Sequence, residues 1–288
     1  METADINKIA VIGGGTMGNG IAHVCAQTGY DVVLIEREER FLERALASIA
    51  RNLDRMVKKE KITSQDKEQA ISRIRATTEF GEIADCDVVI EAVFEERGVK
   101  REVWRAVDQT VKAGALLASN TSTIPITELA AFTERPADFI GMHFMNPVPV
   151  MKLVEVIRGL ETSDVATALT MSLAEQLGKV PVEVNDYPGF ISNRILMPMI
   201  NEAVYAVMEG VAALEAVDSV MKLGMNHPMG PLTLADFIGL DVCLAIMEVL
   251  YDGFRDSKYR PCPLLRKMVA AGRLGRKSGR GFYDYSAR

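Results

Sequence analysis

The sequence has 288 residues, of which 48% are hydrophobic and 25% charged, a composition typical of a soluble globular protein with about two domains. Its formal net charge of −6 argues against general affinity for nucleic acids, which depends on clustered lysines and arginines that neutralise phosphates. The four cysteines are widely spaced and form no Cys-x-x-Cys pair, so neither a zinc ribbon nor a disulfide framework is indicated, and we expect reduced, buried thiols.

Residues 1–8 are polar and acidic, and they have the features of neither a signal peptide nor a transit peptide. No apolar run approaches the roughly 20 residues that a membrane-spanning helix needs. We therefore expect a cytoplasmic protein that has no membrane or nucleic-acid partner.

The first predicted elements form a β-α-β unit. Residues 8–13 are a short apolar run that ends in glycines, and residues 16–28 follow with the apolar spacing of a helix. Gly29 ends this helix, and residues 31–36 form a second apolar strand.

A glycine motif, Gly13-x-Gly15-x-x-Gly18, lies between the first strand and the helix. Small residues here permit a tight turn, the approach of a pyrophosphate to the helix N-terminus and close helix–strand packing, although a purely structural glycine turn is the alternative. Glu36 ends the second strand, where a carboxylate can bond a ribose 2′-hydroxyl and repel a 2′-phosphate. NAD is therefore favoured over NADP as the cofactor, while the adjacent Arg37 keeps NADP as the alternative.

The next two predicted helices, at residues 38–59 and 64–75, form a pair inserted in the minimal unit, and Thr63 or Ser64 is the expected N-cap of the second. The alternation of strands and helices then resumes. The strands are continuous apolar runs, as in a parallel sheet buried on both faces, and lie at residues 87–93, 116–119, 139–144, 153–157 and 180–184. One helix is expected at residues 99–112 and another between the last two strands.

From Pro188 onward helical patterns dominate, to about residue 272, and proline and glycine interrupt both periodicities at residues 185–189. The sequence thus predicts two domains. Residues 1–186 form an α/β domain with a Rossmann-type doubly wound sheet and an inserted helical pair. Residues 187–288 form an all-α C-terminal domain.

Polar residues near the ends of the later strands are candidates for chemistry. Glu95 and Lys100 follow the strand at 87–93, where open α/β sheets bind ligands, or they are a solvated helix start. His143 lies near the end of a strand and is either a core histidine or a base. If the chain turns back as a strand, Glu155 becomes its neighbour and can fix the imidazole tautomer. No carboxylate or cysteine cluster shares the spacing of His23 or His227, so no metal site is predicted.

Five separated motifs resemble, in order, those of the 3-hydroxyacyl-CoA dehydrogenase family, and the short bacterial 3-hydroxybutyryl-CoA dehydrogenases are the most similar members. The resemblance covers essentially the whole chain. The motifs are the glycine motif, Ser119-Asn-Thr-Ser-Thr123, His143-Phe-Met-Asn-Pro-Val-Pro-Val-Met151, Pro188-Gly-Phe-Ile-Ser-Asn-Arg194 and Gly230-Pro-Leu-Thr-Leu-Ala-Asp236.

The resemblance implies NAD-dependent, reversible oxidation of (S)-3-hydroxyacyl-CoA by a homodimer in fatty acid or butanoate metabolism. It implies that His143 is the general acid/base, that Glu155 orients it, and that Ser122 and Asn193 bond the substrate oxygens, with Asn146 near the substrate. The cofactor contacts expected from the motifs are Gly13, Gly15, Thr16, Met17, Gly18, Glu36, Glu95, Lys100 and Asn120. Many members carry Asp at the position of Glu36, which bears on discrimination between NAD and NADP.

Coenzyme A carries several phosphates, so an acidic chain needs a local basic patch to bind it. Arg51, Arg55 and Lys59 recur every four residues along the first inserted helix, and Lys58 lies beside them. We expect this stripe to meet the adenosine phosphates of an acyl-CoA substrate. The alternative is a solvated helix face paired with Asp54 and Glu60.

Two other functions compete with this one. A dehydrogenase of free β-hydroxy acids would carry a lysine four residues before the C-terminal asparagine, whereas Gly189 precedes Asn193 here. A dinucleotide-binding sensor without catalysis would not need the set of Ser122, His143, Glu155 and Asn193. The motifs leave the acyl chain length and the physiological direction open.

Overall fold

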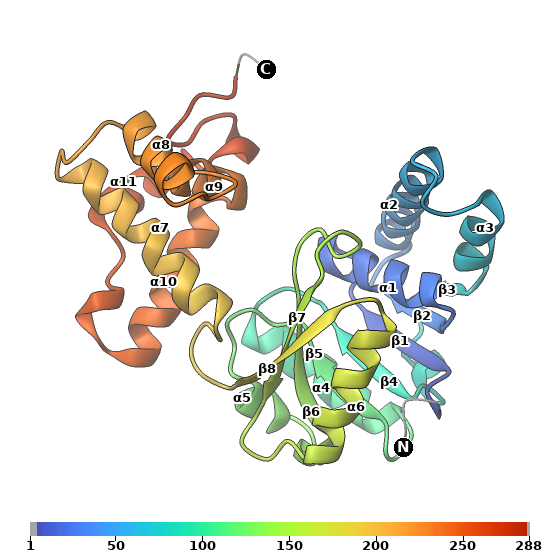
Figure 1. Ribbon diagram of the computed structural model, residues 1–288. Coiled ribbons are helices and arrows are strands. Elements are labelled where there is room, and N and C mark those ends of the chain that lie inside the picture. The colour runs from blue at the N-terminus through green and yellow to red at the C-terminus, as the bar shows by residue number, and fades with distance from the viewer. Residues whose placement is uncertain (1–4, 287–288) are drawn as a thin grey trace. The chain divides into compact units, whose positions relative to one another are not determined.

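The computed structural model describes residues 5–286 and divides into two compact units, residues 1–186 and 187–288. Figure 1 shows an α/β unit and a helical unit. The polar segment at residues 1–8, for which no targeting signal was expected, begins outside the described residues.

The first unit is built on one eight-stranded sheet with the order β3-β2-β1-β4-β5-β6-β7-β8. All neighbouring strands are parallel except β6 and β7, which are antiparallel. The strands are β1 (Lys8–Ile12), β2 (Asp31–Ile35), β3 (Ile74–Thr77), β4 (Val88–Glu91), β5 (Leu116–Ser119), β6 (Phe139–Phe144), β7 (Leu153–Arg158) and β8 (Val180–Asn185).

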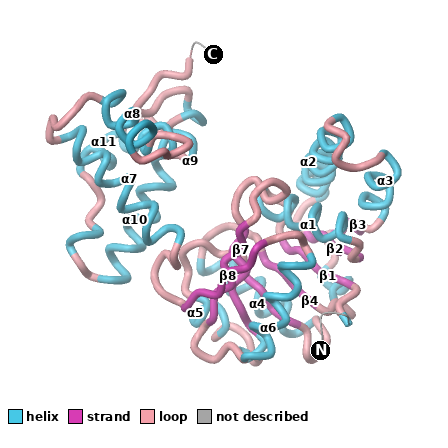
Figure 2. Tube along the Cα trace, in the orientation of Figure 1, coloured by secondary structure: helices cyan, strands magenta, loops and turns pink. Residues whose placement is uncertain are grey.

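Helices pack on both faces of this sheet, and Figure 2 shows the alternation of helix and strand along the chain. They are α1 (Thr16–Thr28), α2 (Glu39–Lys58), α3 (Ser64–Ser72), α4 (Arg97–Thr110), α5 (Ile126–Ala130) and α6 (Asp164–Gln176). The predicted fold class, a Rossmann-type sheet with an inserted helical pair followed by a helical domain, is confirmed.

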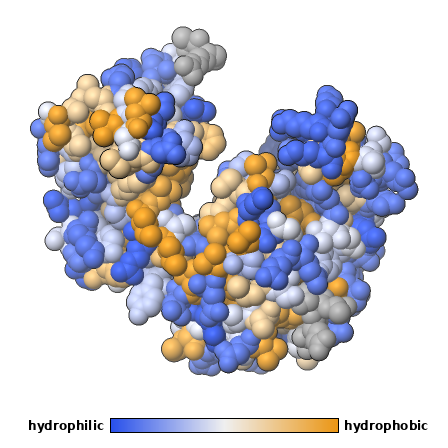
Figure 3. Space-filling view, viewed as in Figure 1, coloured by the Kyte–Doolittle hydropathy of each residue, from blue (hydrophilic) through white to orange (hydrophobic). Residues whose placement is uncertain are grey.

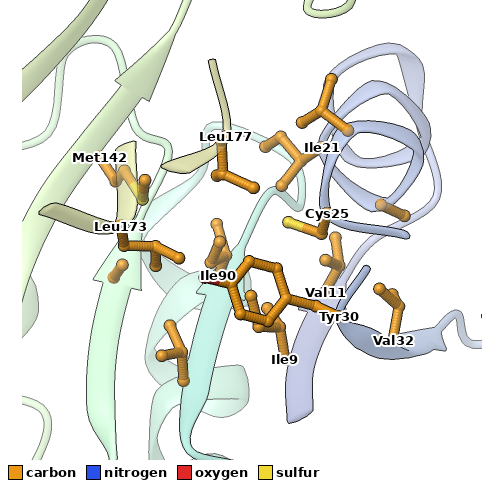
Figure 4. Packing of buried hydrophobic residues seen from close by; sticks show 14 of the residues in the cluster. Ile9, Val11, Ile21, Cys25, Tyr30, Val32, Ile90, Met142, Leu173 and Leu177 are labelled. Carbon is orange, nitrogen blue, oxygen red and sulfur yellow. The ribbon is translucent and has the colours of Figure 1, made fainter. Parts of the chain in front are cut away.

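The core on one face of the sheet joins α1 and α6 to alternate residues of the strands. Figure 4 shows Ile21 and Cys25 of α1 and Leu173 of α6 packed with Ile9, Val11 and Ile90. On the opposite face, Trp104 of α4 meets Phe139 of β6 edge to face, with ring centroids 4.5 Å apart. Because both faces are covered by apolar packing, the polar groups of this unit gather at the strand ends.

The second unit is helical and has a core of its own. Its helices are α7 (Ser192–Met208), α8 (Leu214–Gly224), α9 (Pro231–Ile238), α10 (Leu240–Phe254) and α11 (Pro263–Ala270). Two buried carboxylates, Asp218 and Asp236, fix backbone segments of this unit. Asp218 accepts hydrogen bonds from the backbone N–H groups of Leu232 and Thr233 in the first turn of α9, and Asp236 from those of Phe282 and Tyr283 in the C-terminal segment.

One predicted boundary is wrong. The helix expected at residues 64–75 ends at Ser72, and β3 begins at Ile74. Ile74 and Ala76 pack against the core while the backbone pairs with β2, so strand pairing overrides the helical pattern. At the other end of α3, Thr63 is the N-cap, and it forms a capping box with Asp66.

All four cysteines are buried, as expected, and none of them is in a disulfide bond. Within residues 5–286, no helix has both the length and the apolar character needed to cross a membrane.

Burial of His23 on α1 makes the stability of the first unit depend on pH. The side chain is fully buried and its Nδ1 atom has no hydrogen-bond partner among the described residues. Burial lowers the pKa of His23 below the ordinary value of 6.5. Between its folded-state pKa and 6.5 the unfolded chain binds more protons than the folded one, so stability falls as the pH drops through this window.

We therefore expect His23→Met to flatten the loss of stability below pH 6.5, by at most about 1.4 kcal/mol per pH unit. Urea unfolding at several pH values, followed by the fluorescence of Trp104, the only tryptophan, measures the effect in the first unit. His227→Met in the second unit is the control and should retain the wild-type decline. An equal decline in wild type and His23→Met would contradict the prediction.

Candidate active site

The carboxyl ends of four parallel strands meet at one edge of the sheet. Ile12 of β1 pairs with Glu91 of β4, Glu91 with Ser119 of β5, and Ser119 with Gly141 of β6. The chain beyond this row carries the glycine loop, Glu95, the loop after β5 and His143. This edge is where open α/β sheets bind their ligands.

The three glycines of the motif have different roles. Gly13 has a φ of +98°, and a Cβ atom there would lie 2.7 Å from the carbonyl oxygen of Ala92. A Cβ atom on Gly18 would lie 1.7 Å from the oxygen of Gly13, so this residue permits close packing of α1 on the turn. A Cβ atom on Gly15 would meet nothing within 4 Å. The loop is therefore closed on two sides and open at Gly15.

This open side fits a dinucleotide. Helix α1 begins at Thr16, which Met17 follows, and Gly15 is its N-cap. No side chain caps the first backbone N–H groups of the helix. An unfilled helix N-terminus beside open space suits a pyrophosphate. Glu36 lies next to it: its Oε1 atom accepts a hydrogen bond from the backbone N–H of Gly14, 2.8 Å away. The carboxylate is therefore fixed at the glycine loop, as binding a ribose hydroxyl requires.

His143 and Glu155 are direct neighbours across the antiparallel pair of β6 and β7. The Nδ1 atom of His143 lies 2.8 Å from Oε2 of Glu155, and both residues are buried. A carboxylate only accepts hydrogen bonds, so Nδ1 carries the proton of this bond and Nε2 remains the basic nitrogen. The structure thus brings the predicted pair together in the orientation of a general base.

Ser122 lies on the other side of the imidazole. Its Oγ atom is 3.0 Å from Nε2 of His143. The loop that carries it is held by Glu95, whose Oε1 atom accepts hydrogen bonds from the backbone N–H groups of Ser122 and Thr123, both at 2.8 Å. The Oδ1 atom of Asn120 accepts a hydrogen bond from the backbone N–H of Phe144, which ties the end of β5 to the end of β6.

The side chain of Lys100 is only 1% exposed. Lys100 is therefore not part of a solvated helix start, and its burial also keeps it from direct contact with a ligand. Its Nζ atom lies 2.5 Å from Oε1 of Glu91 and 3.3 Å from Oε2 of Glu95. Burial acts to raise the pKa of Glu95. The charge of Lys100 and the hydrogen bonds from Thr121, Thr123 and the backbone of Ser122 outweigh this effect, so the pKa is lowered. Sequence reasoning missed Glu91, although a carboxylate at the end of an apolar strand was a visible signal.

The loop after β6 is fixed by a buried lysine that sequence reasoning also missed. The ammonium of Lys179 donates to the carbonyl oxygens of Val148 and Met151, and burial lowers its pKa. Val148 packs against Gly20 of α1, where a Cβ atom would come within 2.8 Å of it. Asn146, the predicted substrate contact, is exposed on this loop.

Two further groups of predicted residues belong to helices. Asn193 belongs to the second unit and is buried in the first turn of α7. Arg51, Arg55 and Lys58 are exposed on α2, and Lys59 is exposed at its C-cap, where Figure 3 shows a hydrophilic surface. None of the four forms an ion pair within residues 5–286. Asp54, their expected partner in the alternative interpretation, pairs with Lys67 of α3 instead.

The contrast between two glycines of the loop predicts different effects of the same substitution. Gly15→Ala should leave the melting temperature within a few degrees of wild type and weaken NADH binding, because its methyl group enters the space left for the pyrophosphate. Gly13→Ala should lower the melting temperature, because the residue has positive φ and no room. Thermal unfolding and fluorescence titration with NADH measure both. Unchanged NADH affinity in a folded Gly15→Ala variant would contradict the assignment of the open side.

Comparisons with known proteins cover nearly the whole chain. Residues 8–187 match the family model for the 3-hydroxyacyl-CoA dehydrogenase NAD binding domain, and residues 189–285 match that for the C-terminal domain. A probable 3-hydroxybutyryl-CoA dehydrogenase of Deinococcus radiodurans is 59% identical over 96% of this chain and 100% of its own length. A 3-hydroxybutyryl-CoA dehydrogenase of Bradyrhizobium diazoefficiens is 55% identical over 98% of this chain and 96% of its own.

The crystal structure of the (S)-3-hydroxybutyryl-CoA dehydrogenase PaaH1 from Ralstonia eutropha is similar with a TM-score of 0.96. It has 52% sequence identity and covers 98% of this chain and 99% of its own. Both family models and the similarity of the whole fold therefore indicate the same family. The chain belongs to the 3-hydroxyacyl-CoA dehydrogenase family.

Proposed function

We propose that this protein catalyses the reversible, NAD-dependent oxidation of (S)-3-hydroxyacyl-CoA to 3-oxoacyl-CoA, with 3-hydroxybutyryl-CoA as its short-chain substrate. The observation that carries the proposal is the continuous hydrogen-bonded set of Ser122, His143 and Glu155 at the strand ends that also carry the glycine loop. The names of the relatives support the choice of the thioester substrate.

In this reaction His143 moves the proton. Its Nε2 atom accepts the proton of the substrate hydroxyl, and the imidazolium that forms is stabilised by Glu155, 2.8 Å from Nδ1. In the reverse direction the imidazolium returns the proton to the forming alkoxide. Bound NAD supplies the hydride acceptor for the carbinol carbon.

Ser122 and Asn193 supply hydrogen-bond donors for the substrate oxygens. The Oγ atom of Ser122, 3.0 Å from Nε2, is placed to share the hydroxyl of the substrate with the imidazole. We assign the amide of Asn193 to the same oxygen or to the thioester carbonyl. Asn146 on the exposed loop borders the substrate, and Asn120 lies near the nicotinamide side.

The cofactor assignment follows from the glycine loop. Gly13, Gly15, Thr16, Met17 and Gly18 surround the pyrophosphate, and Glu36 takes the ribose hydroxyls, which favours NAD over NADP. Glu95 lies next to the nicotinamide side of the site. Lys100 acts here through Glu95, because its own ammonium is buried.

The phosphates of coenzyme A are assigned to the basic stripe of Arg51, Arg55, Lys58 and Lys59. These cations are exposed and have no ion pairs within the described range, so their charge is available to an anion. Since the whole chain carries a net charge of −6, such a local patch is needed to offset repulsion of an anionic substrate.

We further propose a cytoplasmic homodimer that forms through the second unit. That unit exposes several large apolar side chains, which a dimer interface would cover: Ile195, Val211, Val220, Leu223 and Phe237.

Loss of the base should slow turnover strongly without abolishing binding. We expect His143→Gln to lower kcat for acetoacetyl-CoA reduction by about 10²–10⁴-fold, because acid/base catalysis contributes that factor. The KM for NADH should stay near the wild-type value. Stopped-flow or steady-state NADH oxidation measures both. Wild-type turnover in His143→Gln would overturn the assignment, and NADH binding without turnover by the wild-type protein on acyl chains of any length would favour a sensor.

Reversal of charge on α2 tests the coenzyme A assignment. The double variant Arg55→Glu, Lys59→Glu should raise the KM for acetoacetyl-CoA about 10- to 100-fold, because hydrogen bonds to charged groups are lost and repulsion is added. The KM for NADH should change little. The matched control Arg101→Glu, Arg105→Glu makes the same change of charge with the same spacing on α4. Equal effects of the two double variants would leave only a general electrostatic contribution and contradict a specific phosphate site.

A further inference from the structure

Glu91 is a charged residue in a place where its burial needs an explanation. It is the last residue of β4, is 0% exposed and follows three buried apolar residues of the same strand. A carboxylate removed from water is costly unless ion pairing and hydrogen bonds replace its hydration. Glu91 has such partners, and all of them lie near the strand ends that carry the candidate active site.

The first connection runs through Lys100 to the loop after β5, which carries Ser122. Oε1 of Glu91 accepts hydrogen bonds from Nζ of Lys100 and from the backbone N–H of Val93. Lys100 also reaches Oε2 of Glu95, 3.3 Å away, and Glu95 in turn accepts the backbone N–H of Ser122. One buried ammonium therefore lies between two carboxylates, and the outer carboxylate holds the loop.

The second connection runs through β5. Oε2 of Glu91 accepts the hydroxyl proton of Ser119, with 2.7 Å between the oxygens. The same hydroxyl oxygen accepts the backbone N–H of Thr121 at 3.2 Å. The loop between Ser119 and Thr123 is thus fixed by two chains of hydrogen bonds and ion pairs, one through Ser119 and one through Lys100 and Glu95. Both chains end at the carboxylate of Glu91.

We propose that Glu91 is a positioning residue that fixes the Oγ atom of Ser122 beside Nε2 of His143. The inference rests on the proposed function, in which these two atoms face the substrate hydroxyl. Both oxygens of Glu91 accept hydrogen bonds and the side chain is 0% exposed, whereas the amide of a glutamine has only one accepting oxygen. It can therefore accept from Lys100 or from Ser119 as Glu91 does, but not from both. Displacement of a catalytic group by 1 Å can cost up to about 10²-fold in rate, so the effect should appear in kcat.

A double-mutant cycle tests the inference. In acetoacetyl-CoA reduction, Glu91→Gln should lower kcat about 10-fold or more in the wild-type background. In the Ser122→Ala background it should lower kcat less than about twofold, because the group that it positions is gone. An equal loss in both backgrounds would overturn the proposal and indicate general damage to the fold.

The matched control is Asp108→Asn. Asp108 also lies in a mostly buried ion pair of the same unit, with Arg135 at 2.7 Å, but it holds the segment after α5. This variant should leave kcat near wild type in both backgrounds. If Glu91→Gln does not fold, as judged by circular dichroism, Ser119→Ala removes only the second connection and should show the same dependence on Ser122.

A second measurement is independent of turnover. The chain has three histidines, so the imidazole resonances of His143 can be assigned by substitution and followed by NMR at fixed pH. Glu91→Gln should change the chemical shift of Nε2, because the Oγ atom of Ser122 no longer lies 3.0 Å from it, and Asp108→Asn should not. Unchanged chemical shifts would overturn the positioning role. Failure of the wild-type protein to reduce acetoacetyl-CoA would overturn the proposed function alone, since this NMR result does not depend on the substrate.

Discussion

The antiparallel pairing of β6 with β7 is the constraint on which the site depends. It is the only reversal of direction in the sheet within the described residues, and its register places His143 opposite Glu155. Because successive residues of a strand point to opposite faces, a shift of one residue would turn one member of this pair away from the other. Burial of the flanking valines and of Met142 on the other face holds the register in place.

The remaining functional groups are held by charged side chains rather than by apolar packing. Glu36 forms a hydrogen bond with the glycine loop, Glu95 with the loop after β5, and Lys179 with the loop after β6. Each of these charged groups has backbone partners, so each fixes a loop and not merely another side chain. Such fixed dipoles and charges need no rearrangement when substrate charge develops, which is the basis of electrostatic preorganisation.

Local patterns in the sequence were sufficient for much of this description. The glycine motif, Glu36 and the strand ends follow from short-range rules, and the pairing of His143 with Glu155 followed once a returning strand was assumed. β3 was missed because four residues on a half-exposed edge give too short an alternation to compete with the helical pattern before it. Lys100 was misjudged because its burial depends on Glu91, and contact between different elements is not encoded in local spacing.

The arrangement of the proposed acid/base pair has a consequence for folding. His143 and Glu155 lie only twelve residues apart on one hairpin, so the chain entropy lost in bringing them together is small. The connection from Glu91 to Ser122, by contrast, spans two strands and a crossover helix. The contact between His143 and Glu155 is therefore local, whereas the loop that carries Ser122 is positioned through the long-range pairing of β4 with β5. Assembly of this catalytic site is thus expected to proceed in two steps of unequal contact order.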